Sequence, residues 1–304
     1  MISSKFSSEN INCSEQAADK LLPCPICHQS SELIFNKYGY WIRACQNCGH
    51  RFADLSPTAA HTHQVYGDDY FAGGGAGYPD YLAEANLLRR QGRRYGNKLK
   101  RYTQPGRVLD VGAAAGFILQ GLMDTGWQGQ GVEPNAGMAA HAREQLGLAV
   151  QTGTLENLSS EGQYDLITFI QVLPHFFNLR QALTVASEMT ALEGYWLIET
   201  WNRSSWTARL LGQNWHEYSP PSVLHWFSLN DVSQLGRQFG FRTVAQGRPA
   251  KWINGAHAKS LFRYKLQGSP LGKPLLPLLK LVPDGLAFPY PAEDLFWILL
   301  QKVT

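Results

Sequence analysis

A short apolar strand, a glycine turn and a helix start follow one another in the run VLDVGAAAGF, from Val108 to Phe117. A second short strand then ends in GVEP, which contains Glu133. A glycine turn at a helix N-terminus presents backbone N–H groups, and an acid at the tip of the next strand can accept hydrogen bonds from ribose hydroxyls. These residues therefore predict a binding site for a nucleoside cofactor.

The glycine pattern narrows the cofactor class. A dinucleotide site requires G-x-G-x-x-G, because its second glycine lets the pyrophosphate approach the backbone. This chain offers only Gly112 and Gly116, and Ala114 stands at the middle position. No Gly-Lys-Ser/Thr sequence is present, which excludes a P-loop. The turn thus favours a nucleoside without a pyrophosphate.

Four cysteines form a second constellation. Two C-x2-C pairs, separated by 17 residues, comprise Cys24, Cys27, Cys45 and Cys48. Two such knuckles facing each other give a tetrahedral four-thiolate site that suits zinc, with paired strands expected at 33–35 and 40–42. A redox dithiol or an iron–sulfur cluster is the alternative, but a redox C-x-x-C normally opens a helix within a βαβ unit. Because four thiolates leave no open coordination position, the metal is expected to be structural.

Length, composition and motifs together predict the domain organisation. The chain has 304 residues, 44% hydrophobic and 17% charged, with a net charge of +3. We expect a flexible tail at 1–20, a zinc ribbon at 21–54, a linker and a helix capping the cofactor site at 55–104, and one large domain at 105–304. Neither a secretory signal nor an apolar run long enough to span a membrane is apparent, so a cytoplasmic protein is expected.

The large domain alternates strand and helix patterns. Strands are predicted at 107–112, 128–133, 149–152, 164–172, 195–201, 242–246 and 295–302, and helices at 117–125, 136–146, 179–191 and 228–239. Repeated strand–helix units predict an α/β fold with a doubly wound, mostly parallel sheet of seven strands.

The turn also resembles a known motif. The segment 110–116 resembles motif I of class I S-adenosylmethionine-dependent methyltransferases, with Ala114 in place of a glycine. Segments 154–156 and 164–175 resemble the adenine-pocket segment and motif IV of that family. The resemblance spans 105–245 in the correct order. It implies a Rossmann-like fold, S-adenosylmethionine as cofactor, and cofactor contacts from Tyr70, Asp110, Gly112, Ala113, Gly116, Glu133, Pro134, Thr154, Leu155 and Gln171.

A narrower resemblance includes the cysteine ribbon and the tail at 288–294. A ribbon followed by this fold is similar to bacterial class I methyltransferases that act on small molecules or sugar-like substrates. It implies methyl transfer to a hydroxyl or a carbon. A hydroxyl acceptor benefits from a general base, and His175, which follows the fourth strand, and His225 are the candidates. Either histidine could instead be structural.

Two further segments bear on the acceptor. The aromatic segment 201–227 predicts a lid over an organic substrate, or alternatively a hydrophobic subcore. Residues 89–107 contain eight lysines or arginines and no acid, which fits either a solvated helix face or an anionic acceptor such as a nucleotide-linked sugar, a phosphate or RNA.

An RNA methyltransferase is the main alternative function, with the ribbon and the basic helix binding nucleic acid. The chain lacks an Asn/Asp-Pro-Pro-Tyr/Phe motif after the fourth strand, and it has no cysteine beyond Cys48. Adenine N-methylation and pyrimidine C5-methylation are therefore disfavoured, whereas guanine N-methylation is not. A binding protein that keeps the fold without catalysis is a third hypothesis. The sequence names neither the acceptor nor the oligomeric state.

Overall fold

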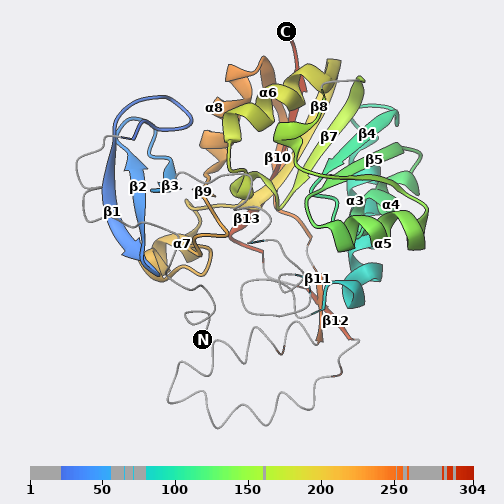
Figure 1. The fold of residues 1–304 in the computed structure, drawn as a ribbon, viewed down its shortest axis with the longest axis horizontal. Helices are drawn as coiled ribbons and strands as arrows, with labels where there is room; N and C mark the ends of the chain where they lie inside the picture. The colour runs from blue at the N-terminus through green and yellow to red at the C-terminus, as the bar shows by residue number, and fades with distance from the viewer. Residues whose placement is uncertain are drawn as a thin grey trace.

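The chain folds into a seven-stranded sheet with helices on both faces and a small four-stranded sheet at one side (Figure 1). The structure is a computed structural model. It describes residues 22–55, 65, 71, 80–159, 162–250, 252–255, 259, 283, 286–289 and 292–304. The tail predicted at 1–20, most of the linker predicted at 55–80, and Tyr70 lie outside the described residues.

The large sheet has the strand order β10-β13-β8-β7-β4-β5-β6. Its strands are β4 (Arg107–Val111), β5 (Gln128–Glu133), β6 (Ala149–Thr152), β7 (Tyr164–Ile170), β8 (Thr190–Trp201), β10 (Phe241–Gly247) and β13 (Leu295–Lys302). β13 is antiparallel to both of its neighbours, and the other pairs are parallel. The predicted fold class, a mostly parallel doubly wound sheet of seven strands, is confirmed.

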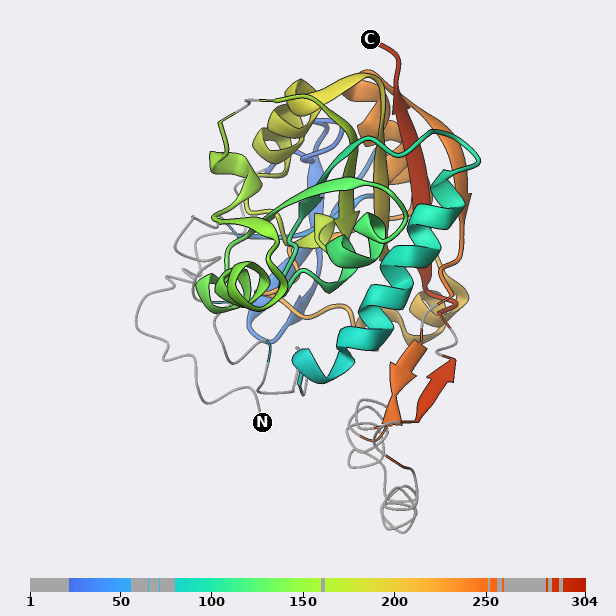
Figure 2. The same ribbon diagram turned by 90° about the vertical axis from the view of Figure 1, so that its right-hand side faces the viewer.

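Both faces of this sheet are buried. Successive residues of β13 alternate between two cores: Phe296 and Ile298 pack in the first, Trp297 and Leu299 in the second. The first core includes residues of α6 (Leu179–Met189) and α8 (Leu229–Gln238), and the second includes residues of α3 (Ala85–Leu99), α4 (Phe117–Met123) and α5 (Ala136–Leu146). Figures 1 and 2 show the two helix layers on opposite sides of the strands. Such two-sided burial explains the nearly continuous apolar strand sequences.

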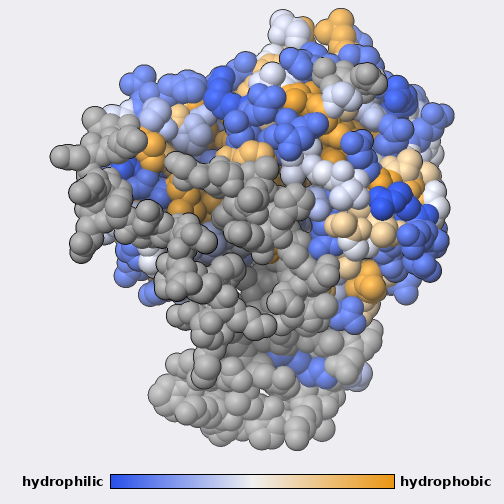
Figure 3. Space-filling view, in the orientation of Figure 1, coloured by the Kyte–Doolittle hydropathy of each residue, from blue (hydrophilic) through white to orange (hydrophobic). Residues whose placement is uncertain are grey.

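The outer surface is more polar than these cores. In Figure 3 the described surface is mainly hydrophilic, with hydrophobic residues scattered across it. The described residues contain no helix that is long and apolar enough to cross a membrane.

Helices α3 and α4 cross with their backbones almost in contact. A Cβ atom added at Gly92 would lie 2.2 Å from the Ile118 carbonyl oxygen, and one at Gly121 would lie 2.1 Å from that of Arg89. Only glycine permits so close an approach. The crossing holds α3 beside the C-terminal edge of the sheet, where its residues Leu88 and Gln91 line the main pocket.

The small sheet has the order β1-β2-β3-β9. It consists of β1 (Ser31–Lys37), β2 (Tyr40–Cys45), β3 (Arg51–Ala53) and β9 (His225–Trp226), and all its pairs are antiparallel. The predicted pairing of 33–35 with 40–42 is confirmed by β1 and β2. Because β9 belongs to the chain after β8, the cysteine-bearing segment shares a sheet with the large domain.

The structure differs from the lid predicted at 201–227. Trp215, Tyr218 and Trp226 are buried in a separate core together with Ile42 and Ala53 of the small sheet. None of the aromatic side chains of 201–227 lines the main pocket. The physical reason is that β9, together with the segment that follows α7 (Trp206–Leu211), must cover the apolar face of the small sheet. Two short strands, β11 (Trp252–Asn254) and β12 (Ala287–Pro289), form a separate antiparallel pair.

The crossing of α3 and α4 gives a test of the fold. Gly92→Ala should lower the free energy of unfolding by about 1–3 kcal/mol, since the added methyl group meets backbone atoms. The thermal midpoint should then fall by several degrees. Asn97→Ala, at an exposed position on the same helix, is the control. Equal midpoints for the two variants would contradict the backbone contact.

Candidate functional site

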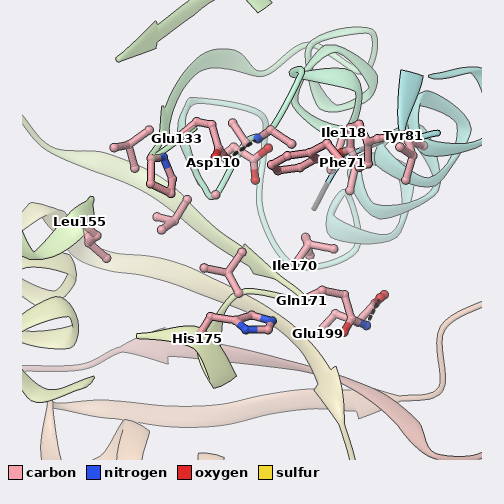
Figure 4. A pocket seen from close by; sticks show the side chains of 18 of the residues that line it. Phe71, Tyr81, Asp110, Ile118, Glu133, Leu155, Ile170, Gln171, His175 and Glu199 are labelled. Carbon is pink, nitrogen blue, oxygen red and sulfur yellow. Dashed lines mark hydrogen bonds between the residues drawn. The ribbon is translucent and has the colours of Figure 1, made fainter. Parts of the chain in front are cut away.

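The main pocket opens at the C-terminal ends of the parallel strands. Residues that follow β4, β5, β6 and β7 line it, together with Glu199 near the end of β8. Figure 4 shows Asp110 and Glu133 on one side of the space and Gln171, His175 and Glu199 on the other. Ligands of open α/β sheets bind at this edge.

The glycine turn after β4 is fixed by the neighbouring strand. The N–H groups of Gly112 and Ala113 donate to the carbonyl oxygen of Val132, over 2.8 and 3.1 Å. Gly112 has φ +68°, and an added Cβ would lie 2.4 Å from a methyl group of Val172. Glycine is therefore needed here for conformation and for space.

The two other small residues of the motif differ in their roles. Ala114, at the middle glycine position, adopts φ +47° and lines the pocket. Gly116 precedes α4 with φ +83° but does not line the pocket, and a Cβ there would lie 2.5 Å from Leu148. Gly116 thus shapes the turn by its packing.

Glu133 ties this turn to the next one. Its two carboxylate oxygens accept hydrogen bonds from the N–H groups of Ala114 and Asn135, both at 2.8 Å. The side chain is only 3% exposed and lines the pocket. A carboxylate oxygen can accept more than one hydrogen bond, so each oxygen retains capacity for a ligand hydroxyl.

Two buried carboxyl groups share the base of the pocket. Burial raises the pKa of Asp110 to about 7, opposed by a 2.5 Å hydrogen bond from the Thr168 hydroxyl. Burial raises the pKa of Glu133 to about 7 as well, with its two backbone N–H bonds opposing the rise and the Asp110 charge adding to it. The folded protein therefore holds protons that the unfolded chain releases. These groups make the free energy of unfolding decrease as the pH rises from about 4 to about 7.

The segment after β6 lines the far end of the pocket. Thr154, Leu155 and Glu156 all line it, as does Pro134 after β5. Glu156 is 7% exposed, and burial raises its pKa. Within the described part of the chain, its Oε1 is buried without a hydrogen-bond partner. An unmatched acceptor in a pocket is suited to an N–H donor of a bound molecule, such as an exocyclic amine.

A network of hydrogen-bonded side chains lies at the opposite end of the pocket. The Glu199 carboxylate accepts hydrogen bonds from Gln171 Nε2 at 2.9 Å, from Gln91 Nε2 at 3.2 Å and from the Tyr95 hydroxyl. Burial, followed by the Glu199 charge, raises the pKa of Tyr95. Glu199 is fully buried. Sequence reasoning missed Glu199 and Gln91, although an acid near the end of the apolar strand YWLIETW is the signal that could have found it.

Gln171 holds an uncommon backbone conformation. Its φ is +61°, a region that non-glycine residues enter rarely. Its N–H donates to the Glu199 carbonyl oxygen at 2.9 Å, while its side chain bonds the carboxylate of the same residue. Glu199 thus fixes the backbone and the side chain of Gln171 at the pocket wall.

His175 lies in the loop after β7 and lines the pocket. Its Nδ1 is 2.7 Å from the Ser222 carbonyl oxygen. Because a carbonyl only accepts, Nδ1 carries the proton in this contact. Burial lowers the pKa of His175, opposed by the carbonyl groups of Ser222 and Gln171. The ring is therefore neutral near pH 7, as a general base must be.

His225, the other predicted catalytic histidine, does not line the pocket. It is 9% exposed, stacks on His50, and has its Nε2 3.2 Å from the Phe176 carbonyl oxygen. Burial lowers its pKa to about 3. It sits in β9, so the strand pairing that joins the small sheet to the large domain holds it behind the loop that carries His175.

The four cysteines gather as predicted. Their sulfur atoms lie within 4.8 Å of one another. The sulfur–sulfur distances are 3.6 Å for Cys24–Cys48, 3.3 Å for Cys27–Cys45 and 3.5 Å for Cys27–Cys48. Tetrahedral coordination at a Zn–S distance of about 2.3 Å requires sulfur separations of about 3.8 Å. The donor set and its spacing fit a zinc ion, which would link the two knuckles.

The mostly parallel sheet and the pocket at the C-terminal ends of its strands are those of an α/β protein with a Rossmann-like fold. A family model described as a methyltransferase domain matches residues 85–246. The chain belongs to this methyltransferase family.

Comparisons with individual proteins agree with this family. Ubiquinone biosynthesis O-methyltransferase of Azorhizobium caulinodans is 27% identical over 143 residues, which are 44% of this chain and 56% of the relative. That of Bradyrhizobium diazoefficiens is 27% identical over 125 residues, 40% and 47% of the two chains. The chain thus spans about half the length of these curated relatives.

Two solved structures show the same fold. One is the Burkholderia thailandensis 1,6-didemethyltoxoflavin-N1-methyltransferase, with a TM-score of 0.51, 13% identity and coverage of 85% of this chain and 98% of the other. The second is a complex of a methyltransferase activator with a methyltransferase from Haloferax volcanii, with a TM-score of 0.52, 15% identity and coverage of 74% and 96%. At these identities the likeness concerns the fold alone.

The cysteine cluster yields a direct test. Metal analysis of the purified protein should give about one zinc ion per chain, because four thiolates bind zinc tightly. Cys45→Ala/Cys48→Ala should abolish the zinc and lower the thermal midpoint, whereas Cys13→Ala, which leaves the four clustered cysteines in place, should change neither. Metal-free protein with an unchanged midpoint would refute the zinc assignment.

Proposed function

We propose that the protein is an S-adenosylmethionine-dependent methyltransferase that methylates a hydroxyl or a carbon of a small molecule. The observation that carries this proposal is one continuous pocket that joins the Glu133-braced turn to the Glu199 network. The family membership supports the reaction class. The name of the curated relatives, an O-methyltransferase of ubiquinone biosynthesis, supports a small organic acceptor.

The residues of the pocket fit the proposed cofactor in their donor and acceptor types. Glu133 offers acceptors for ribose hydroxyls, and the unmatched Glu156 Oε1 suits the adenine amine. Asp110 would pair with the ammonium group of the methionyl end, and Gly112 and Ala113, whose N–H groups are bound to Val132, would line that end with their backbone. The cofactor supplies a methyl group already activated on a sulfonium. Pro134, Thr154 and Leu155 would pack around its nucleoside end.

The protein's own task is to orient the acceptor and to manage its proton. His175 lines the pocket as a neutral imidazole, with Nδ1 protonated toward Ser222. We propose that it accepts the proton of an acceptor hydroxyl. Gln171, fixed by Glu199, would set the wall between the cofactor and the acceptor. His225 is better suited to support the loop of His175 than to touch substrate.

The small-molecule acceptor is favoured over RNA by charge. No lysine or arginine stands among the described residues that line the main pocket, whereas five carboxyl-bearing residues do: Glu84, Asp110, Glu133, Glu156 and Glu199. A polyanionic strand would be repelled from such walls.

Residues 105–304 would carry catalysis, and the cysteine ribbon at 21–54, with a structural zinc ion, would support the adjoining loop.

The cofactor proposal predicts a pH-dependent affinity. The α-ammonium group, which S-adenosylhomocysteine shares with the cofactor, favours ionised Asp110, and ribose hydroxyl donors favour ionised Glu133. The pKa values of both carboxyl groups are about 7 in the free protein. Affinity for S-adenosylhomocysteine, measured by calorimetry, should therefore rise from pH 6 to pH 8, with proton release. Glu133→Gln should weaken binding roughly ten- to a hundredfold and reduce the pH dependence.

Glu144→Gln, at an exposed acid on α5, is the matched control and should bind normally. Unaltered affinity in Glu133→Gln would remove this residue from the cofactor site.

The reaction itself is tested by methyl transfer from labelled S-adenosylmethionine into a fractionated extract of the source cells. Label should appear in the low-molecular-mass fraction. His175→Ala should lower kcat by about a hundredfold or more without weakening S-adenosylhomocysteine binding, because a general base typically accelerates a reaction by at least about that factor. Label found in RNA, with none in small molecules, would establish the alternative acceptor class instead.

A further inference from the structure

The four arginines of α3 fall into two pairs with different environments. Arg89 and Arg93 both bind Asp124, with Nε–Oδ2 distances of 2.7 and 2.6 Å. The hydrogen bond from Arg89 has the largest influence on Asp124 and, together with that from Arg93, lowers the pKa of Asp124 to about 2 against the opposing effect of burial. This pair is structural, because it ties α3 to the end of α4.

Arg90 and Arg94 have no such partner. In the part of the chain that the structure describes, neither lies within ion-pair distance of a carboxylate. Both line a second cavity, together with Gln91, Trp252 and Ala250. Nη1 of Arg94 donates to the Ala250 carbonyl oxygen at 2.8 Å, and its guanidinium lies 5.7 Å from the Trp252 ring centroid. Arg94 is thereby positioned without being neutralised.

The second cavity adjoins the main pocket. Leu87, Gln91 and Trp252 line both. Gln91 lies at the junction, with its Nε2 bonded to Glu199 inside the main pocket. The strand β11, which bears Trp252, contacts α3, and Figure 2 shows β11 and β12 beside that helix. A molecule could therefore occupy both cavities.

The two cavities have opposite charge. The main pocket carries the five carboxyl-bearing residues named above and, among its described lining residues, no lysine or arginine. The second cavity has Arg90 and Arg94 and no acid among its described lining residues. An anionic group of a substrate is repelled from the first and attracted to the second. Guanidinium groups bind phosphate and carboxylate through paired hydrogen bonds.

We propose that the cavity formed by Arg90, Arg94 and Trp252 binds the anionic group, a phosphate or a carboxylate, of the methyl acceptor. This inference rests on the proposed function. The acceptor then has two different ends. Its uncharged nucleophilic end extends past Gln91 into the main pocket, and its anionic group stays in the second cavity. Such an arrangement sets the acceptor's orientation before methyl transfer.

The site is tested with inorganic phosphate and with acetate as probes. The full chain is labelled with 5-fluorotryptophan, and the fluorine NMR signal of Trp252 is assigned with Trp252→Phe. Phosphate or acetate should shift this signal saturably at constant ionic strength, whereas chloride should not. The probe that binds more tightly identifies the anion class.

Arg90→Gln/Arg94→Gln should weaken this binding roughly tenfold or more, because two charge-assisted contacts are lost. Arg89→Gln/Arg93→Gln, which removes the same charge from the same helix, should leave it unchanged. No saturable shift, an equal shift with chloride, or equal loss in both double variants would overturn the anion site.

Calorimetry with S-adenosylhomocysteine on the same samples separates this inference from the proposed function. Normal cofactor binding without anion binding rejects the acceptor site alone. Absent cofactor binding rejects the proposed function, and the fluorine signal still reports on the anion cavity.

Discussion

The buried carboxylate of Glu133 is the interaction on which the site depends. A charge at 3% exposure requires hydrogen-bond donors, and it finds them in the N–H groups of two turns, at Ala114 and Asn135. The same two hydrogen bonds therefore stabilise the buried carboxylate and fix the backbone of the two turns that line the pocket. Gly112 and Ala114 can hold their left-handed conformations because this bracing, together with the Val132 carbonyl group, leaves the turn no freedom.

The cysteine-bearing sheet supports the other wall of the pocket, which carries His175. Through β9, its strands continue into the segment that hydrogen-bonds the loop after β7: the Leu224 N–H donates to the Pro174 carbonyl oxygen at 2.9 Å, and His175 contacts Ser222. Trp215, Tyr218 and Trp226, three of the aromatic residues in the segment predicted as a lid, belong to the apolar core of this junction. The cysteine-bearing sheet is therefore connected to His175 through hydrogen bonds to the loop after β7.

The sequence predicted the elements with strong local signals. The seven strands follow from their apolar patterns and the glycines between them, and the helix predicted at 228–239 is present as α8, which begins with a capping box of Ser228 and Asp231. The cysteine spacing predicted the four-sulfur cluster. The sequence could not predict which side chains contact one another in the folded protein. Gln91, Glu199 and the different partners of Arg89 and Arg90 depend on where α3 lies, which in turn depends on its crossing with α4 at Gly92. For the same reason, burial of His225 could not be distinguished from exposure in the pocket.

We propose that the braced turn and the two buried carboxyl groups form the binding site for S-adenosylmethionine. A crystal structure of the protein with S-adenosylhomocysteine tests this claim most directly. In this complex we expect ribose hydroxyls hydrogen-bonded to Glu133, the adenine beside Leu155 with its amine toward Glu156, and the sulfur atom facing the Gln171–His175 side of the pocket. A ligand bound elsewhere, or a nucleoside at this edge that makes no contact with Glu133, would contradict it.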